Sequence, residues 1–191
     1  DLFFENAVHI IESAENPGAA RAYIYGGICH FALDSECHPY IEKMIQESGI
    51  SHSEIEMEFD RLLMKQDYIN PLRHLSTGHI HPGKENAEVI APFYEELTPQ
   101  IVEKCMKSMI FYHKLLLAPG RAKRRLLFGG MKLIGAYDGM HGMVMSLEPN
   151  PACKEYCQFL KRLFAGAVPL AAGLIIQYQK KLFQGGELPS R

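Results

Sequence analysis

The chain has 191 residues, of which 47% are hydrophobic and 22% charged, and its formal net charge is −2. This composition is typical of a folded domain with one sizeable core and excludes a disordered or fibrous protein. Because Lys and Arg are not in surplus, we predict no nucleic-acid partner. Five cysteines in a chain too large to need disulfides indicate reduced thiols and a cytoplasmic location.

Two apolar segments, one at the start of the chain and one near its carboxyl end, lead to further expectations. An apolar helical pattern begins at Leu2, directly after Asp1, so we expect the chain to lack an amino-terminal segment of a longer protein. The longest nonpolar run, Leu163 to Ile176, contains Pro169 and is shorter than the roughly 20 residues that cross a bilayer. We therefore predict that this run is buried core and that the chain has no transmembrane segment.

Apolar residues recur every three or four positions through most of the chain, and period-two alternation is scarce. This pattern predicts an all-α fold with a single multi-helix domain over residues 1–191. In chain order we expect helices over 2–14 and 19–37, a shorter one ending near 47, then 51 or 53 to 64, 98–117, and 151–183 as one helix or two. Pro39 is expected to end a helix, since proline disfavours helical geometry in the residue before it. Residues 68–83 are expected to form a loop, and 129–142 irregular structure or short helical turns.

Two sets of metal-binding side chains occur at helical spacing. His30, Asp34 and His38 stand four residues apart, and His52 and Glu56 repeat that spacing on the next long helix. Imidazole nitrogen and carboxylate oxygen both bind zinc, whereas calcium and magnesium prefer mostly oxygen ligands. We predict a zinc site between the two helices, with nonheme iron and manganese as open alternatives.

The same residues also have an ordinary structural interpretation. His30 would be a hydrogen-bonded helix residue, His38 a cap, and His52 with Glu56 a solvated ion pair. For the remaining candidates we favour structural roles: histidines 9, 79, 81, 113 and 141, and cysteines 29, 37, 153 and 157. The basic run 121–125 is interpreted as a solvated helix face, with an anionic lipid headgroup or phosphate as the alternative contact.

The string Gly27-Ile-Cys-His-Phe-Ala-Leu-Asp-Ser-Glu-Cys-His-Pro-Tyr40, followed by His52-x-x-x-Glu56, resembles the bacterial zinc-dependent phospholipase C family. A related branch of that family comprises zinc nucleases specific for single strands. The resemblance covers residues 1–66 well and implies an all-helical domain with two or three zinc ions. It implies that His30 and Asp34 bind one zinc, with Asp34 a candidate bridge, and that His38, His52 and Glu56 bind a second.

The activity implied by the resemblance is metal-assisted hydrolysis of a phosphodiester, with phospholipids among the candidate substrates. The family's upstream ligands, an amino-terminal residue, a histidine and an aspartate, have no match in this chain, so no catalytic residue is predicted. Two alternatives stay open: a noncatalytic helical protein stabilised by a partial metal cluster, and a single-strand nuclease of the related branch.

Overall fold

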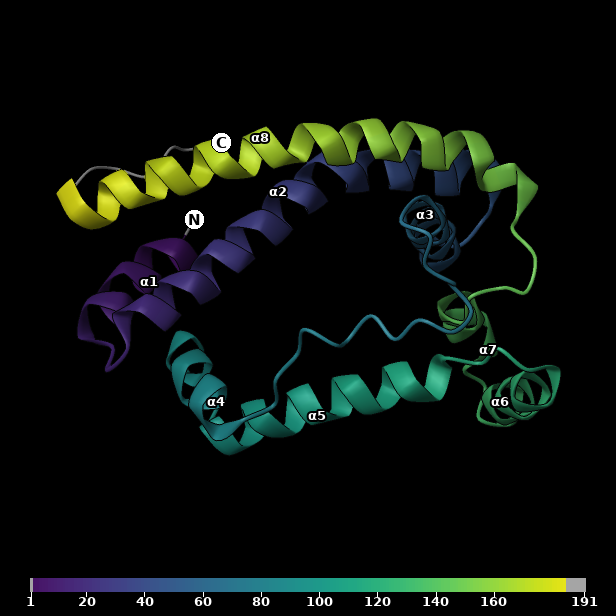
Figure 1. Ribbon diagram of the computed structural model, residues 1–191, viewed down its shortest axis with the longest axis horizontal. Helices are drawn as coiled ribbons and strands as arrows, with labels where there is room; N and C mark the ends of the chain where they lie inside the picture. Colours follow the sequence, from purple (N-terminus) through teal and green to yellow (C-terminus); the bar gives the residue numbers. More distant parts are fainter. Residues whose placement is uncertain (1, 185–191) are drawn as a thin grey trace. The chain divides into compact units, whose positions relative to one another are not determined.

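A computed structural model describes residues 2–184, and its regular secondary structure is helical, without a strand in that range. The all-α prediction is therefore confirmed. The helices drawn in Figure 1 are α1 (Leu2–Ser13), α2 (Pro17–Ser48), α3 (His52–Gln66), α4 (Lys84–Ile90), α5 (Pro99–Leu116), α6 (Arg121–Leu133), α7 (Tyr137–Met140) and α8 (Lys154–Gln184). Short 3₁₀ helices in the described residues are η1 (Ala91–Phe93), η2 (His141–Met143) and η3 (Pro151–Cys153).

The chain forms two compact units, each built from separated stretches of sequence. The first unit contains the residues up to 36, those from 80 to 108 and those from 164 onward. The second contains residues 37–79 and 109–163. Helices α2, α5 and α8 each contribute residues to both units. The single domain over residues 1–191 stays a prediction.

The core of the first unit forms where α1 packs along the amino-terminal part of α2 (Figure 1). Ala20, Ile24 and Ile28 are buried on α2 at intervals of four residues, which places them on one face of the helix. Ile11 of α1 and Tyr178 of α8 belong to the same cluster. In the second unit, Met131 of α6 packs with Ala118 and Val144.

Pro39 does not end a helix, which corrects the expected break: α2 is continuous from Pro17 to Ser48. Cys37 and Ile41 are buried on either side of Pro39, while Pro39 itself is exposed. Burial of its neighbours stabilises the helix on both sides of the proline. Solvent can reach the site where the proline ring removes a backbone hydrogen bond, which lowers the cost of that loss.

The boundaries of the other elements lie closer to their predicted positions. The helix α6 extends through Gly129 and Gly130, so the expected irregular stretch begins only at Gly135, whose φ of +70° ends the helix in a left-handed conformation. The short turns α7 and η2 follow as expected. Residues 68–83 form the expected loop, helices α4 and η1 were not predicted, and 154–184 is one helix rather than two.

The nonpolar run from Leu163 to Ile176 is not buried core, contrary to the prediction. Within it only Ala167 and Ala171 are buried, and Val168 is 60% exposed. The segment Pro151–Phe183 is long and apolar enough to cross a membrane, with a mean hydropathy of 1.7 over its most apolar window. Core helices can meet the same criterion of length and composition. The lack of a transmembrane segment and the cytoplasmic location therefore stay predictions.

Candidate metal centre

Helices α2 and α3 bring three of the five predicted ligands together. His38 of α2 and His52 and Glu56 of α3 each offer a ligand atom, and these atoms lie within 4.8 Å of one another. All three residues belong to the second unit. The spacing of His52 and Glu56 places them one turn apart on the same face of α3, which lets both side chains reach His38.

Glu56 is the centre of this group. Its Oε1 atom lies 3.0 Å from Nε2 of His52 and 3.7 Å from Nε2 of His38. The two imidazole rings meet edge to face, with centroids 5.1 Å apart. The three side chains are between 36% and 49% exposed, so the group is open to solvent on one side.

The sequence sets the orientation of α3 at its first turn. The side chain of Ser51, one of the two caps predicted, accepts a hydrogen bond from the backbone N–H of Glu54 at 3.3 Å. The inner face of the helix buries Ile55, Glu58 and Arg61, which recur every three residues. His52 and Glu56 lie off this buried face, and they therefore remain accessible to a metal ion.

Glu42 is a functional candidate that the sequence analysis missed. Its Oε1 atom lies 3.5 Å from Nδ1 of His52, on the side of the ring opposite Glu56. A carboxylate in this place favours the imidazole tautomer with a proton on Nδ1 and a free lone pair on Nε2. The signal was present in the sequence, since Glu42 follows His38 at the same four-residue spacing on α2.

The other two predicted ligands, His30 and Asp34, form a pair on α2 within the first unit. Nε2 of His30 lies 3.1 Å from Oδ2 of Asp34, and the imidazole is 78% exposed. Ile28 and Ala32, two residues earlier in each case, are on the buried face of α2. A shift of two residues turns the side chain through about 200° on a helix, which accounts for the exposure of this pair.

A pocket of about 250 Å³ in the second unit is lined by residues of α3 that follow Glu56. Asp60, one turn beyond Glu56, lines it together with His74 and His113, and four methionines contribute to its walls. The surrounding protein raises the pKa of Asp60 by desolvation, the nearby Glu56 raises it further, and His113 partly opposes both. His113 was predicted to be structural, and no spacing along the chain would place it beside Asp60.

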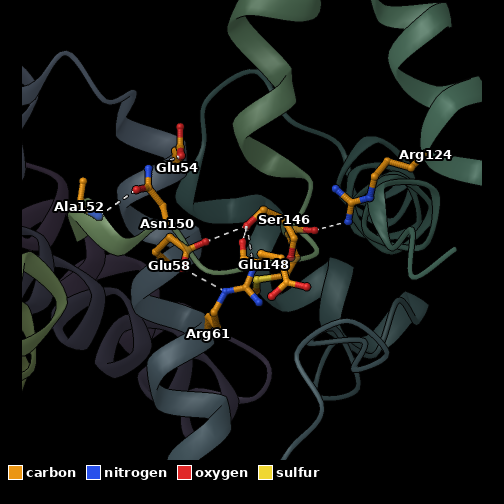
Figure 2. A network of polar contacts seen from close by, with 9 residues as sticks. Glu54, Glu58, Arg61, Arg124, Ser146, Glu148, Asn150 and Ala152 are labelled. Atoms are coloured by element: carbon orange, nitrogen blue, oxygen red, sulfur yellow. Dashed lines mark hydrogen bonds and ion pairs between the residues drawn. The ribbon is translucent and has the colours of Figure 1, made fainter. Parts of the chain in front are cut away.

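A network of polar contacts holds α3 against the segment after η2 (Figure 2). Arg61 donates from Nε to Glu58 at 3.0 Å and from its terminal nitrogen to the hydroxyl of Ser146 at 2.8 Å. Nδ2 of Asn150 donates to Glu54 at 2.8 Å. Arg124 of α6 donates to the carbonyl of Met145 in the same segment. These contacts immobilise the inner side of the helix that carries His52 and Glu56.

The remaining candidates do not join this group. Cys153 and Cys157 are buried free thiols, as predicted, and Cys37 is buried while Cys29 is exposed. His79 and His81 are exposed in the 68–83 loop. Among the described residues, the set that could hold a metal ion therefore consists of two imidazoles and one carboxylate.

Comparisons of this chain with models of protein families, with curated proteins and with solved structures found no match.

Proposed function

We propose that this protein is a zinc-dependent hydrolase of phosphodiester bonds, with His38, His52 and Glu56 as ligands of a zinc ion. One observation carries the proposal: these three donors lie within 4.8 Å of one another on a side open to solvent. Structural zinc sites are usually closed by four protein ligands, whereas catalytic sites keep a position for water beside three ligands such as two histidines and a glutamate.

Each residue has a distinct part in this proposal. His38 and His52 supply neutral nitrogen donors, and Glu56 supplies the negative charge that partly balances the ion. Glu42 acts as a positioning residue, because its contact with Nδ1 of His52 keeps Nε2 available. A bound zinc ion would polarise the phosphoryl oxygens and lower the pKa of a coordinated water to about 7.

The substrate class comes from the resemblance of residues 27–40 and 52–56 to zinc-dependent phospholipases C. The pocket that begins at Met57 supports it, because methionines in its walls suit a substrate with an apolar part, such as a phospholipid. Asp60 lines that pocket, and its raised pKa is the direction needed to donate a proton to a leaving alcohol. Desolvation is the larger cause of this shift, so the pKa of Asp60 stays raised when an ion offsets the charge of Glu56.

The experiment separates binding of the metal from turnover. The protein is loaded with zinc and desalted, its zinc content is measured by elemental analysis, and hydrolysis of a short-chain phosphatidylcholine is followed. Glu56→Gln and His52→Ala are expected to lose one zinc per chain together with activity. Asp60→Asn is the matched variant: it keeps the zinc and lowers turnover about 100-fold, the usual size of a general-acid contribution. A chelator is expected to abolish hydrolysis by the unaltered protein.

The other results are equally decisive. Equal zinc content in the unaltered protein and in Glu56→Gln would contradict the assignment of the ligands. Zinc that raises the melting temperature without hydrolysis of any ester would favour the noncatalytic, metal-stabilised alternative. Cleavage of single-stranded DNA or RNA in place of the phospholipid would favour the nuclease alternative.

A further inference from the structure

Helix α6 has one face that packs inward. Met131 is buried, and Leu127 and Phe128 pack in the same cluster of the second unit. Arg124, on this side, donates to the carbonyls of Ala118 and Met145. Packing against the core of the second unit therefore explains why apolar residues occur on this face of α6.

The opposite face of α6 is also apolar, and it is exposed. Leu126 and Leu133 are 79% and 88% exposed, and Ile134, the residue after the helix, is 74% exposed. Seven residues separate the two leucines, which places them on the same face, two turns apart. Water-soluble helices normally present charged or polar residues at such positions, so this stripe of two leucines, with Ile134 beside its carboxyl end, needs another explanation.

Basic side chains border the exposed stripe. Arg121, Arg125 and Lys132 are exposed and share one side of α6, next to the leucines. Lys123, on the other border, donates instead to two carbonyls at the end of α5. The helix has no acidic residue.

The surrounding sequence is also free of negative charge. Residues 104–137 contain eight of the chain's 20 Lys and Arg and none of its 22 Asp and Glu. The formal net charge of the whole chain is nevertheless −2. Positive charge is therefore concentrated in one segment rather than spread over the molecule.

We infer that the outer face of α6 is a docking surface for an anionic lipid bilayer, with Leu126, Leu133 and Ile134 inserted among the lipids and Arg121, Arg125 and Lys132 at the headgroups. Helices that lie in a membrane interface combine an exposed apolar stripe with flanking basic residues, and both forces contribute to their binding. A nucleic acid would match the charge but not the aliphatic stripe, because its phosphates and base edges are polar. The inference is independent of the proposed hydrolase activity.

Cosedimentation with lipid vesicles tests the surface on the whole chain. The unaltered protein is expected to bind vesicles of phosphatidylcholine mixed with phosphatidylserine more tightly than vesicles of phosphatidylcholine alone, and to bind them less as salt increases. Arg121→Gln with Arg125→Gln is expected to weaken binding roughly 30-fold, taking about 1 kcal/mol per basic residue and 1.4 kcal/mol per tenfold. Leu126→Ser with Leu133→Ser is expected to weaken it about tenfold or more.

Matched variants elsewhere give the controls. Lys43→Gln with Lys84→Gln removes the same charge at lysines that face Glu47 and Glu88, and it should leave binding within twofold. Leu2→Ser replaces a leucine that is 75% exposed on α1 and should have as little effect. Circular dichroism checks that each variant keeps its helices. Binding should also persist with a chelator, which separates this surface from the metal centre.

Several outcomes would overturn the inference. One is equal binding by the unaltered protein and the α6 variants. A second is loss of binding on Val168→Ser with Ile176→Ser, with the α6 variants unaffected, because α8 would then be the contact. A third is preference for single-stranded DNA over anionic vesicles.

Discussion

Arg61 and Glu58 are charged side chains that are only 4% and 6% exposed. Each depends on the other for compensation of its buried charge, and Ser146 joins them because its hydroxyl contacts both side chains. Such a pair adds little net stability over apolar residues of the same size, yet removal of one partner is costly. The pair therefore determines how the inner face of α3 packs, although it contributes little net free energy to folding.

Arg61→Met is expected to lower the free energy of unfolding by about 3–5 kcal/mol, because the carboxylate of Glu58 is left buried without a cation. Urea denaturation followed by circular dichroism measures this change. Arg73→Met, at an exposed arginine of the 68–83 loop, is the control and should change stability by less than about 0.5 kcal/mol. A loss below about 1 kcal/mol for Arg61→Met would show that water or another side chain compensates Glu58.

At the scale of single residues, sequence spacing predicted the three candidate ligands that the structure brings together, along with His30 and Asp34, which form a pair of their own. It worked for His52 and Glu56 because both lie on one helix, where the spacing alone fixes their separation. It did not find His113 as a neighbour of the site, because His113 lies on α5 and only the fold brings it to the pocket that Asp60 of α3 lines. The periodicity of one helix does not show which residues of another helix lie close to it.

At the scale of elements, the start of α3 depends on η2 lying close against it. A Cβ atom on Gly142 would lie 2.5 Å from Oγ of Ser53, 3.0 Å from Oγ of Ser51 and 3.1 Å from the backbone nitrogen of Glu54. The hydroxyl of Ser53 can rotate away. A shift of Ser51 or Glu54 would disturb the helix cap, so a side chain at position 142 is expected to strain the start of α3.

Gly142→Ala is therefore expected to shift the first turn of α3, which carries His52. We expect a loss of about 1–2 kcal/mol in the free energy of unfolding and a roughly tenfold weaker affinity for zinc. Thermal denaturation and titration with a competing chelator measure the two effects. Gly139→Ala, where a Cβ atom would meet nothing within 4 Å, is the control. Equal affinities in the two variants would mean that η2 does not position the metal ligands.

Pro39 shows the limit of local rules at this scale. The sequence predicted a break because proline disfavours helical geometry in the residue before it. Residues buried on both sides of Pro39 belong to cores that the local sequence does not reveal. Their burial outweighs the local cost, and α2 continues.

At the scale of the whole molecule, buried thiols are expected to lower the free energy of unfolding at alkaline pH. Burial raises the pKa of Cys153 to about 11 and that of Cys157 to about 12, from an ordinary value near 9. The unfolded chain therefore releases these protons at lower pH than the folded protein. The two thiols do not change the free energy of unfolding well below pH 9, and they lower it as pH rises from about 9 toward 12.

We expect the free energy of unfolding to decrease by at most about 1.4 kcal/mol per pH unit for each thiol within that window. Urea denaturation at about pH 8 and about pH 10.5 measures the slope. Cys157→Ala should reduce the slope, although it lowers stability at both values by leaving a small cavity. The exposed Cys105 offers the control, since Cys105→Ala should leave the slope unchanged. A slope equal in all three proteins would assign the alkaline loss to other groups.

The sequence by itself determined the helical class, most helix positions and the one-turn separation of His52 and Glu56, because each of these follows from spacing along a single helix or from adjacent residues. Tertiary structure alone decided the rest. It assembled two units from separated segments, kept α2 whole through Pro39, left half of the residues from Leu163 to Ile176 exposed and placed Glu42 beside His52. These outcomes depend on which surfaces meet, and hydrophobic burial is not directional, so the pattern of one helix does not identify the surface that will cover it.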